Sequence, residues 1–138
     1  MTPIDFATLQ VGQALPELAL GAINRTTLAL FAGASGDHNP IHIDIDFARK
    51  SGMPDVFAQG MLSMAYLGRL LTQWVPQRQI RQFNVRFLGI THLGNILTCK
   101  GRVVEKYEHA GERIIKVEVL CVTQYGEHKI LGDALIAC

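Results

Sequence analysis

The segment between residues 59 and 74, QGMLSMAYLGRLLTQW, constrains the fold more than any other part of the chain. If it forms a helix, apolar side chains fall on nearly every side, so we expect the helix to be buried around most of its circumference. These side chains are Met61, Leu62, Met64, Ala65, Leu67, Leu70 and Leu71. The small residues Gly60, Ala65 and Gly68 further predict that neighbouring backbone, such as a sheet wrapped around the helix, comes close to it.

After Pro76 the hydrophobic period changes to two residues, which is typical of strands with one solvated face. The segments with this alternation are residues 83–87, 97–103, 114–122 and 129–138. Lys116 and Glu118 are expected on the solvated face, and Gly111 and Gly126 mark tight turns between the last strands.

Other elements are expected before the buried helix. They are a strand within residues 14–20, a helix at 24–34 and a short helix at 46–52. Asn24 is the predicted N-cap of the first helix, and Gly33 and Gly36 are predicted to end it. Helices and strands in separate runs favour the α+β class. An antiparallel sheet curled around one apolar helix is the hot-dog architecture, so we expect a single hot-dog domain over residues 1–138.

Composition narrows the class of partner. Hydrophobic residues make up 49% of the chain and the formal net charge is +1, which argues against disorder and against a nucleic-acid partner. No segment approaches the roughly 20 apolar residues of a membrane span, and residues 1–12 do not resemble a targeting signal. Cys99, Cys121 and Cys138 form no CxxC pair, so we expect free thiols in a reducing, cytoplasmic location.

The most chemically suggestive stretch is SGDHNPIHIDIDFA, residues 35–48. Asp37 and His42 are five residues apart across a bend containing Pro40, so the two side chains can converge on one small molecule. A carboxylate orients water and an imidazole exchanges protons near neutral pH, which makes this pair a candidate for acid–base chemistry. Asp44 and Asp46 are better explained as residues that cap the following helix.

Two other chemistries are weaker alternatives for this stretch. A metal site would use Asp37, His42 and Asp44, with His38 as a further ligand, but no second His or Cys stands at a familiar ligand spacing. A nucleophile at Ser35 is disfavoured because GASG is not the GxSxG elbow of serine hydrolases.

At these residues the sequence resembles the MaoC-like dehydratases, the R-specific enoyl-CoA hydratase family. The resemblance rests on Phe31, followed by Ser35 to His42 in the order SGDHNPIH, and then the small residue Ala48. It extends to FAQGMLSMAYLGRLL, which is similar to the family's central helix, and to NVRFLGITHLGNILTCKGRVVE, similar to its next strand pair. The chain departs from the family at Gln59, where His is frequent, and at Ile90-Thr91, which replaces a common proline.

The resemblance implies reversible syn addition of water to a trans-2-enoyl thioester, giving the R-3-hydroxyacyl thioester without a metal or redox cofactor. Asp37 and His42 would hold the water, and Asn39 would support the loop and the water network. Gly60 would donate its amide to the thioester oxygen, as expected at the free first turn of a helix. The substrate would be a thioester of coenzyme A or of acyl carrier protein.

The resemblance also implies a homodimer with the acyl chain between subunits, and an exposed sheet edge favours the same assembly. Met61, Met64 and Leu67 are expected to line the acyl site.

Two other functions compete with hydration. A hot-dog acyl-CoA thioesterase would need an acidic residue on the central helix, and residues 59–74 contain none. A non-catalytic acyl-thioester binding module would be expected to have lost Asp37 or His42, and both are present.

Overall fold

A computed structural model describes residues 4–138 of the chain. Residues 1–3, the start of the segment for which no targeting signal is expected, lie outside the described part. Five strands form one antiparallel sheet in the order β1-β3-β4-β5-β2. The strands are β1 (Leu18–Ala22), β2 (Ile80–Phe87), β3 (Ile96–His109), β4 (Glu112–Thr123) and β5 (His128–Ala137). The helices are α1 (Arg25–Ser35), α2 (Ile45–Lys50) and α3 (Gly60–Trp74), with short 3₁₀ turns η1 (Pro40–His42) and η2 (Gln77–Gln79).

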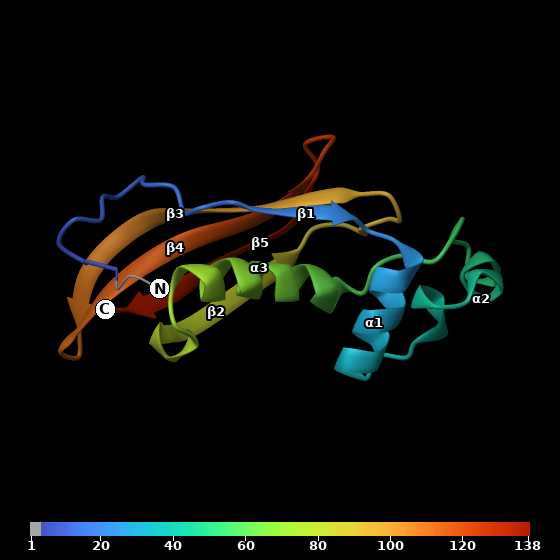
Figure 1. The fold of residues 1–138 in the computed structure, drawn as a ribbon, viewed down its shortest axis with the longest axis horizontal. Coiled ribbons are helices and arrows are strands. Elements are labelled where there is room, and N and C mark those ends of the chain that lie inside the picture. Colours follow the sequence, from blue (N-terminus) through green and yellow to red (C-terminus); the bar gives the residue numbers. More distant parts are fainter. Residues whose placement is uncertain (1–3) are drawn as a thin grey trace.

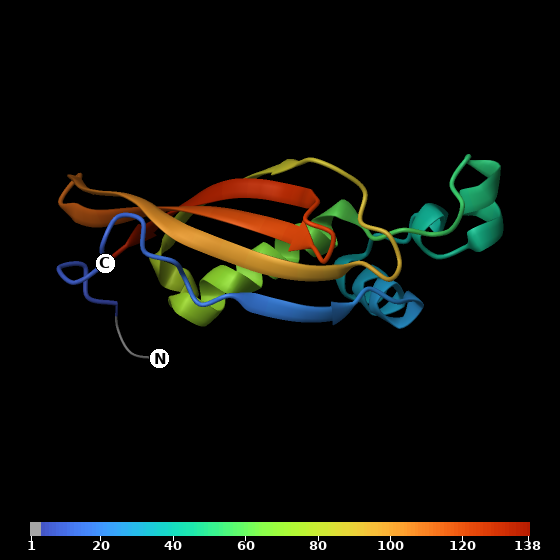
Figure 2. The ribbon, with the colours of Figure 1, turned by 90° about the horizontal axis from the view of Figure 1, so that it is seen from above.

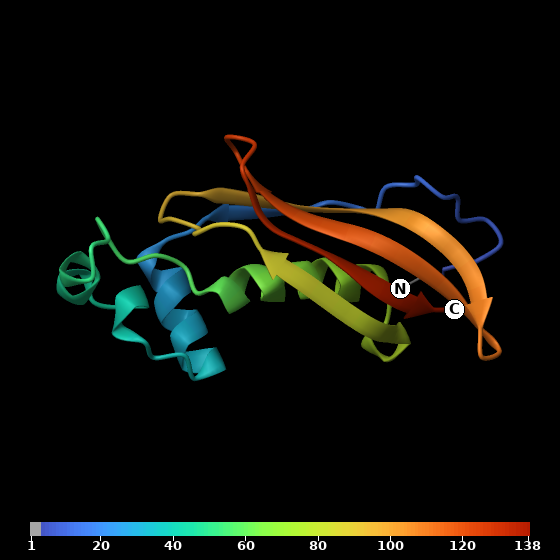
Figure 3. The ribbon, with the colours of Figure 1, turned by 180° about the vertical axis from the view of Figure 1, so that it is seen from behind.

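Helix α3 lies lengthwise along one face of the curved sheet, whereas α1, η1 and α2 lie beyond one end of it (Figures 1 and 2). Viewed from behind, β2 and β5 run along the side of α3 (Figure 3). The core between helix and sheet contains Leu67 and Leu71 from α3, and Ile115, Val117 and Ile130 from the strands, all with at most 1% of their surface exposed. The α+β hot-dog fold is therefore confirmed.

The prediction that α3 is buried around most of its circumference is wrong for the single chain. Leu62, Leu67, Leu70 and Leu71 are buried, but Met61 is 54% exposed. A five-stranded sheet packs against only one side of a helix, so the opposite apolar side of α3 stays uncovered.

The predicted alternation is confirmed in β4, whereas Phe87 at the end of β2 is 50% exposed rather than buried. Ile115 and Val117 are buried, whereas Lys116 is half-buried and Glu118 exposed on the other face of β4. Gly111 and Gly126 occupy the turns with φ of +78° and +80°, a conformation that glycine adopts without strain.

The first strand lies later than predicted, at Leu18–Ala22, and within residues 14–17 only an isolated bridge joins Ala14 to Arg102. Pro16 has no backbone N–H to donate, which explains why regular pairing begins after it.

The two predicted helices before α3 are present within a residue or two. Asn24 caps α1 by accepting from the Thr27 amide at 2.9 Å, and Gly36 ends it in the left-handed conformation, whereas Gly33 lies inside the helix. No helix within residues 4–138 is both long and apolar enough to cross a membrane.

Candidate active site

Residues 36–42, which include Asp37 and His42, lie in the connection between α1 and α2, beyond the end of the sheet (Figure 1). Ser35 donates to the Phe31 carbonyl at 2.6 Å and accepts from the Asp37 amide at 3.2 Å, which turns the chain out of α1. The Asn39 side chain accepts from the Ile41 amide at 3.1 Å and so begins the η1 turn that carries His42. Local hydrogen bonds therefore shape the loop, and the Asn39 side chain binds to the loop backbone.

The structure brings Asp37 and His42 together. Asp37 Oδ2 lies 3.9 Å from His42 Nε2, and the two side chains are 41% and 11% exposed. The other carboxylate oxygen, Oδ1, accepts from the Asn39 amide at 3.3 Å. One oxygen is thus held by the loop, while the other faces both the imidazole and solvent.

His42 is oriented from a distant part of the chain. Its Nδ1 lies 2.7 Å from the Phe57 carbonyl oxygen, and its ring meets the Phe57 ring edge-on at 5.0 Å. Because a carbonyl can only accept, Nδ1 must carry a proton, and in the neutral ring Nε2 is then an acceptor facing Asp37. Sequence reasoning missed Phe57, since the group involved is a backbone carbonyl that any residue could supply.

An apolar groove of about 410 Å³ begins at Asp37 and runs along the uncovered side of α3. It is lined by Phe31, Ser35, Asp37, Met61, Met64, Ala65, Gly68 and Phe83. Met61 and Met64 line it as expected, but Leu67 does not, because it points into the core and is fully buried. A Cβ at Gly68 would make only ordinary contact with Phe83, at 3.7 Å, so this glycine leaves room in the groove rather than admitting nearby backbone.

Gly60 is the first residue of α3, so its amide has no acceptor within the helix. The residue as a whole is exposed. A Cβ at this position would lie 3.3 Å from the Phe87 ring. Glycine is therefore favoured here by packing under Phe87.

The carboxylate of Asp44 is used within α2. Its Oδ1 accepts from the Asp46 amide at 2.9 Å and the Phe47 amide at 3.4 Å, which makes Asp44 the N-cap, while Asp46 lies in the first turn. Within residues 4–138, His, Cys, Asp and Glu side chains form no group of three or more that could hold a metal ion.

Three basic residues on the strands face acidic neighbours. Arg81 pairs with Glu112, Lys100 with Glu17, and Arg102 with Glu118. The hydrogen bond from Arg81 holds the pKa of the Glu112 carboxyl below its usual range.

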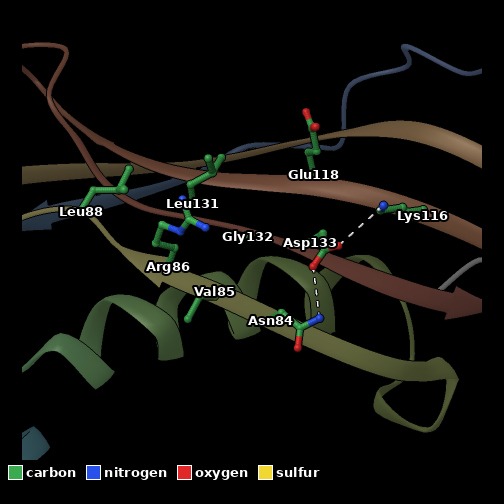
Figure 4. A pocket seen from close by; sticks show the side chains of 9 residues that line it. All are labelled: Asn84, Val85, Arg86, Leu88, Lys116, Glu118, Leu131, Gly132 and Asp133. Atoms are coloured by element: carbon green, nitrogen blue, oxygen red, sulfur yellow. Dashed lines mark hydrogen bonds and ion pairs between the residues drawn. The ribbon is translucent and has the colours of Figure 1, made fainter.

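A second hollow, of about 390 Å³, lies over β2, β4 and β5 and is lined in part by Arg86 and Leu131 (Figure 4). Figure 4 shows Asn84 and Lys116 both reaching Asp133 there. The hollow contains neither Asp37 nor His42, so it is not the candidate active site.

Comparison with known proteins agrees with this geometry. A fatty acid synthase beta subunit of Cochliobolus carbonum is 32% identical over 112 residues, which cover 77% of this chain but only 5% of that much longer protein. An (R)-specific enoyl-CoA hydratase of Rhodospirillum rubrum is 28% identical over 120 residues, covering 83% of this chain and 78% of the enzyme. The unliganded structure of an R-hydratase from Pseudomonas aeruginosa matches with a TM-score of 0.82 at 29% identity, covering 96% of this chain and 84% of that one. The family described as "MaoC like domain" matches residues 9–124, and this protein therefore belongs to the MaoC-like dehydratase family.

Proposed function

We propose that the protein is a hydro-lyase that adds water to trans-2-enoyl thioesters to give R-3-hydroxyacyl thioesters, and catalyses the reverse dehydration. The observation that carries this proposal is the Asp37–His42 pair, 3.9 Å apart, with Asp37 at the start of an apolar groove. The names of the relatives, an (R)-specific enoyl-CoA hydratase and an R-hydratase, support the same chemistry and stereochemistry.

The separation of the pair suits one bridging water. Asp37 Oδ2 and His42 Nε2 are 3.9 Å apart. If a water oxygen lies about 2.8 Å from each of them, the angle between its two hydrogen bonds is roughly 90°. This angle is close enough to tetrahedral for the water to form both bonds. In this proposal Asp37 Oδ2 and His42 Nε2 both accept from the water, which turns a lone pair toward the groove. The water is thereby oriented for attack.

In the hydration step, the water oxygen bonds to the β-carbon and the π electrons move through the α-carbon onto the thioester oxygen. The pair takes up one proton from the water and returns one to the α-carbon, so the site ends in its starting protonation state. Because one water on one face supplies both groups, the addition is syn. The Gly60 amide and the positive end of α3 would stabilise the negative oxygen while it exists.

In this proposal, Asp37 and His42 act on the water, Asn39 holds the loop and Gly60 donates to the thioester. Neither a metal nor a redox cofactor takes part in this mechanism, because every proton and electron is supplied by the substrate, the water and the pair. The carrier is coenzyme A or acyl carrier protein. The three free cysteines support a reducing, cytoplasmic location.

We further propose a homodimer. Among the strands of residues 4–138, β2 is an edge strand that pairs with β5 alone, and the uncovered side of α3 exposes Met61. A second copy would pair the edge and cover the apolar side. Light scattering at micromolar concentration tests this, and a monomer with full hydratase activity would refute it.

The thioesterase and binding-module alternatives are less well supported. Helix α3 carries no Asp or Glu that could activate water against the thioester carbonyl. A binding module has no need of a carboxylate and an imidazole spaced for one water. Hydrolysis would release a free thiol, so a thiol reagent separates thioester cleavage from hydration.

Site-directed variants test the proposal directly. Asp37→Asn and His42→Ala should each lower kcat by about 10² to 10⁴, the usual contribution of a positioned acid or base, and the double variant should be scarcely worse than either. Loss of the enoyl absorbance follows turnover, and chiral analysis should identify the R product.

The controls are Asp44→Asn and Asp46→Asn, which should keep normal turnover and lose about 1 kcal/mol of stability or less. Normal turnover by His42→Ala, or formation of the S-3-hydroxyacyl product, would refute the proposed mechanism. Loss of activity in Asp44→Asn alone would instead favour the metal alternative.

A further inference from the structure

Gln59 occupies the position before the first turn of α3, directly next to Gly60. It is only 1% exposed. A residue at this position commonly accepts from the first free amides of its own helix, but the Gln59 side chain makes no such bond. Its Nε2 instead donates to the Leu28 carbonyl of α1 at 3.2 Å. The first-turn amides of α3 are therefore left without a side-chain partner at the N-cap.

The remaining polar atom of this side chain is unusual. Within residues 4–138, Gln59 Oε1 is a buried side-chain acceptor with no hydrogen-bond partner. Leaving an acceptor buried and unpaired lowers stability, and a leucine or methionine of similar size would avoid this penalty. Packing alone therefore does not explain a glutamine at this position. A need for the Nε2 donor, which binds the Leu28 carbonyl, does explain it.

The Gln59 bond joins the two elements that carry the proposed site. Leu28 lies in α1, whose C-terminal end leads through Ser35 into the Asp37 loop. Gln59 leads directly into Gly60. The start of α3 also contacts Thr91. The Ala58 amide donates to the Thr91 carbonyl at 2.9 Å, and the Ser63 and Thr91 hydroxyls lie 3.4 Å apart. The start of α3 is thus tied to the β2–β3 connection by Thr91 and to α1 by Gln59.

We propose that Gln59 is a positioning residue that sets the placement of the Gly60 amide relative to the water held by Asp37 and His42. This inference rests on the proposed function. In an enoyl thioester, the β-carbon and the thioester oxygen are separated by a fixed bonded framework, so the water and the oxyanion donor must match that separation. A displacement of about 1 Å in such a site can lower the rate by about 10²-fold.

Glutamine and histidine side chains both combine an N–H donor with a separate acceptor, so a histidine can supply a donor in place of Gln59. The Thr91 hydroxyl lies 3.4 Å from that of Ser63, near the start of α3, and so gives this helix end a second contact.

The test compares Gln59→Leu and Gln59→Met, which lack the donor, with Gln59→His, which can restore it. We expect kcat for enoyl-CoA hydration to fall about 10²-fold in the Leu and Met variants, because the oxyanion forms only along the reaction path, while KM changes less than about threefold. Gln59→His should recover kcat to within about fivefold of the wild-type value. Melting temperatures of the Leu and Met variants should stay close to wild type, because the unpaired acceptor is lost together with the donor.

Gln124→Leu is the matched control, because the Gln124 side chain also donates to a backbone carbonyl, that of Gly94 at 3.1 Å, but in a turn outside the site. It should leave kcat unchanged. Wild-type kcat in either folded Leu or Met variant would overturn the inference, as would a His variant that folds yet is as slow as they are. If neither apolar variant folds, Gln59 is needed for stability and the inference is likewise overturned.

Failure of the positioning role of Gln59 can be distinguished from failure of the proposed function. Should Asp37→Asn hydrate at the wild-type rate, the proposed function fails whatever Gln59 does. Should Asp37→Asn be inactive while Gln59→Leu is normal, only the positioning role fails.

Discussion

The uncovered side of α3 predicts a graded limit on acyl chain length. Ala65 and Gly68 both line the groove that starts at Asp37. At 1.5 Å rise per residue, they lie about 7.5 Å and about 12 Å along the helix axis from Gly60, where the thioester is proposed to bind. An extended acyl chain advances about 1.25 Å per carbon for ordinary bond lengths and angles. Ala65 is therefore level with about the sixth carbon and Gly68 with about the ninth.

A leucine at either position should block the groove at that level. A Cβ at Gly68 meets only the Phe83 ring at 3.7 Å, so a larger side chain is accommodated at its base and extends into the groove. Replacing glycine within a helix also favours the helix, by up to about 1 kcal/mol, so the variant should fold. Each methylene kept out of the groove loses about 0.8 kcal/mol of binding, which corresponds to about a fourfold change in kcat/KM.

The positions of Ala65 and Gly68 along the acyl chain predict how kcat/KM depends on chain length in each variant. Gly68→Leu should leave six-carbon substrates unchanged and lower kcat/KM for twelve-carbon substrates by about 60-fold, for about three excluded methylenes. Ala65→Leu should act on shorter chains. It should lower kcat/KM about 200-fold for ten-carbon substrates, because about four methylenes are excluded from the groove. The assay measures enoyl-CoA hydration across even chain lengths from four to twelve carbons.

Gln73→Leu serves as the control, since Gln73 is on the same helix but outside the groove lining. Light scattering on each variant checks that the assembly is unchanged. Equal cut-off lengths for Ala65→Leu and Gly68→Leu, or a uniform loss at every chain length, would contradict an acyl chain running along α3.

Two further predictions concern stability. The lowered pKa of Glu112 means that its pairing with Arg81 stabilises the fold above the ordinary Glu pKa of about 4.3, and that this contribution is lost as pH falls through the lowered value. The difference in melting temperature between wild type and Glu112→Gln should therefore shrink on acidification from about pH 7 to pH 3, and a constant difference would refute the assignment. A Cβ at Gly132 would overlap the Asn84 carbonyl oxygen, so Gly132→Ala should destabilise the protein by about 1–3 kcal/mol in urea unfolding. Gly33→Ala, with nothing within 4 Å of the added carbon, should instead be neutral or stabilising.

The sequence predicts best what local patterns determine. The extent of α3 is predicted to within one residue, because its apolar residues are continuous and Pro76 follows shortly after. The alternation around Lys116 and Glu118 identifies the solvated face of β4, since a strand's side chains must alternate. Asp44 is recognised as a cap because the amides that it binds are two and three residues away.

The sequence does not predict what depends on distant partners. An apolar helix side looks the same whether a sheet, an acyl chain or a second subunit covers it, which is why Met61 and Leu67 could not be told apart. The Gln59 bond spans 31 residues to a backbone carbonyl. Its partner has no side-chain signature.

The proposed catalytic pair shows why a motif alone is insufficient for the chemistry. Asp37 is held by neighbours within two residues, Ser35 and Asn39, so its placement belongs to the motif itself. His42 is held by Phe57, fifteen residues further along the chain, just before α3. That carbonyl makes Nδ1 the donor and leaves Nε2 to face Asp37. The motif supplies both functional groups, but only the folded chain sets which imidazole nitrogen faces Asp37.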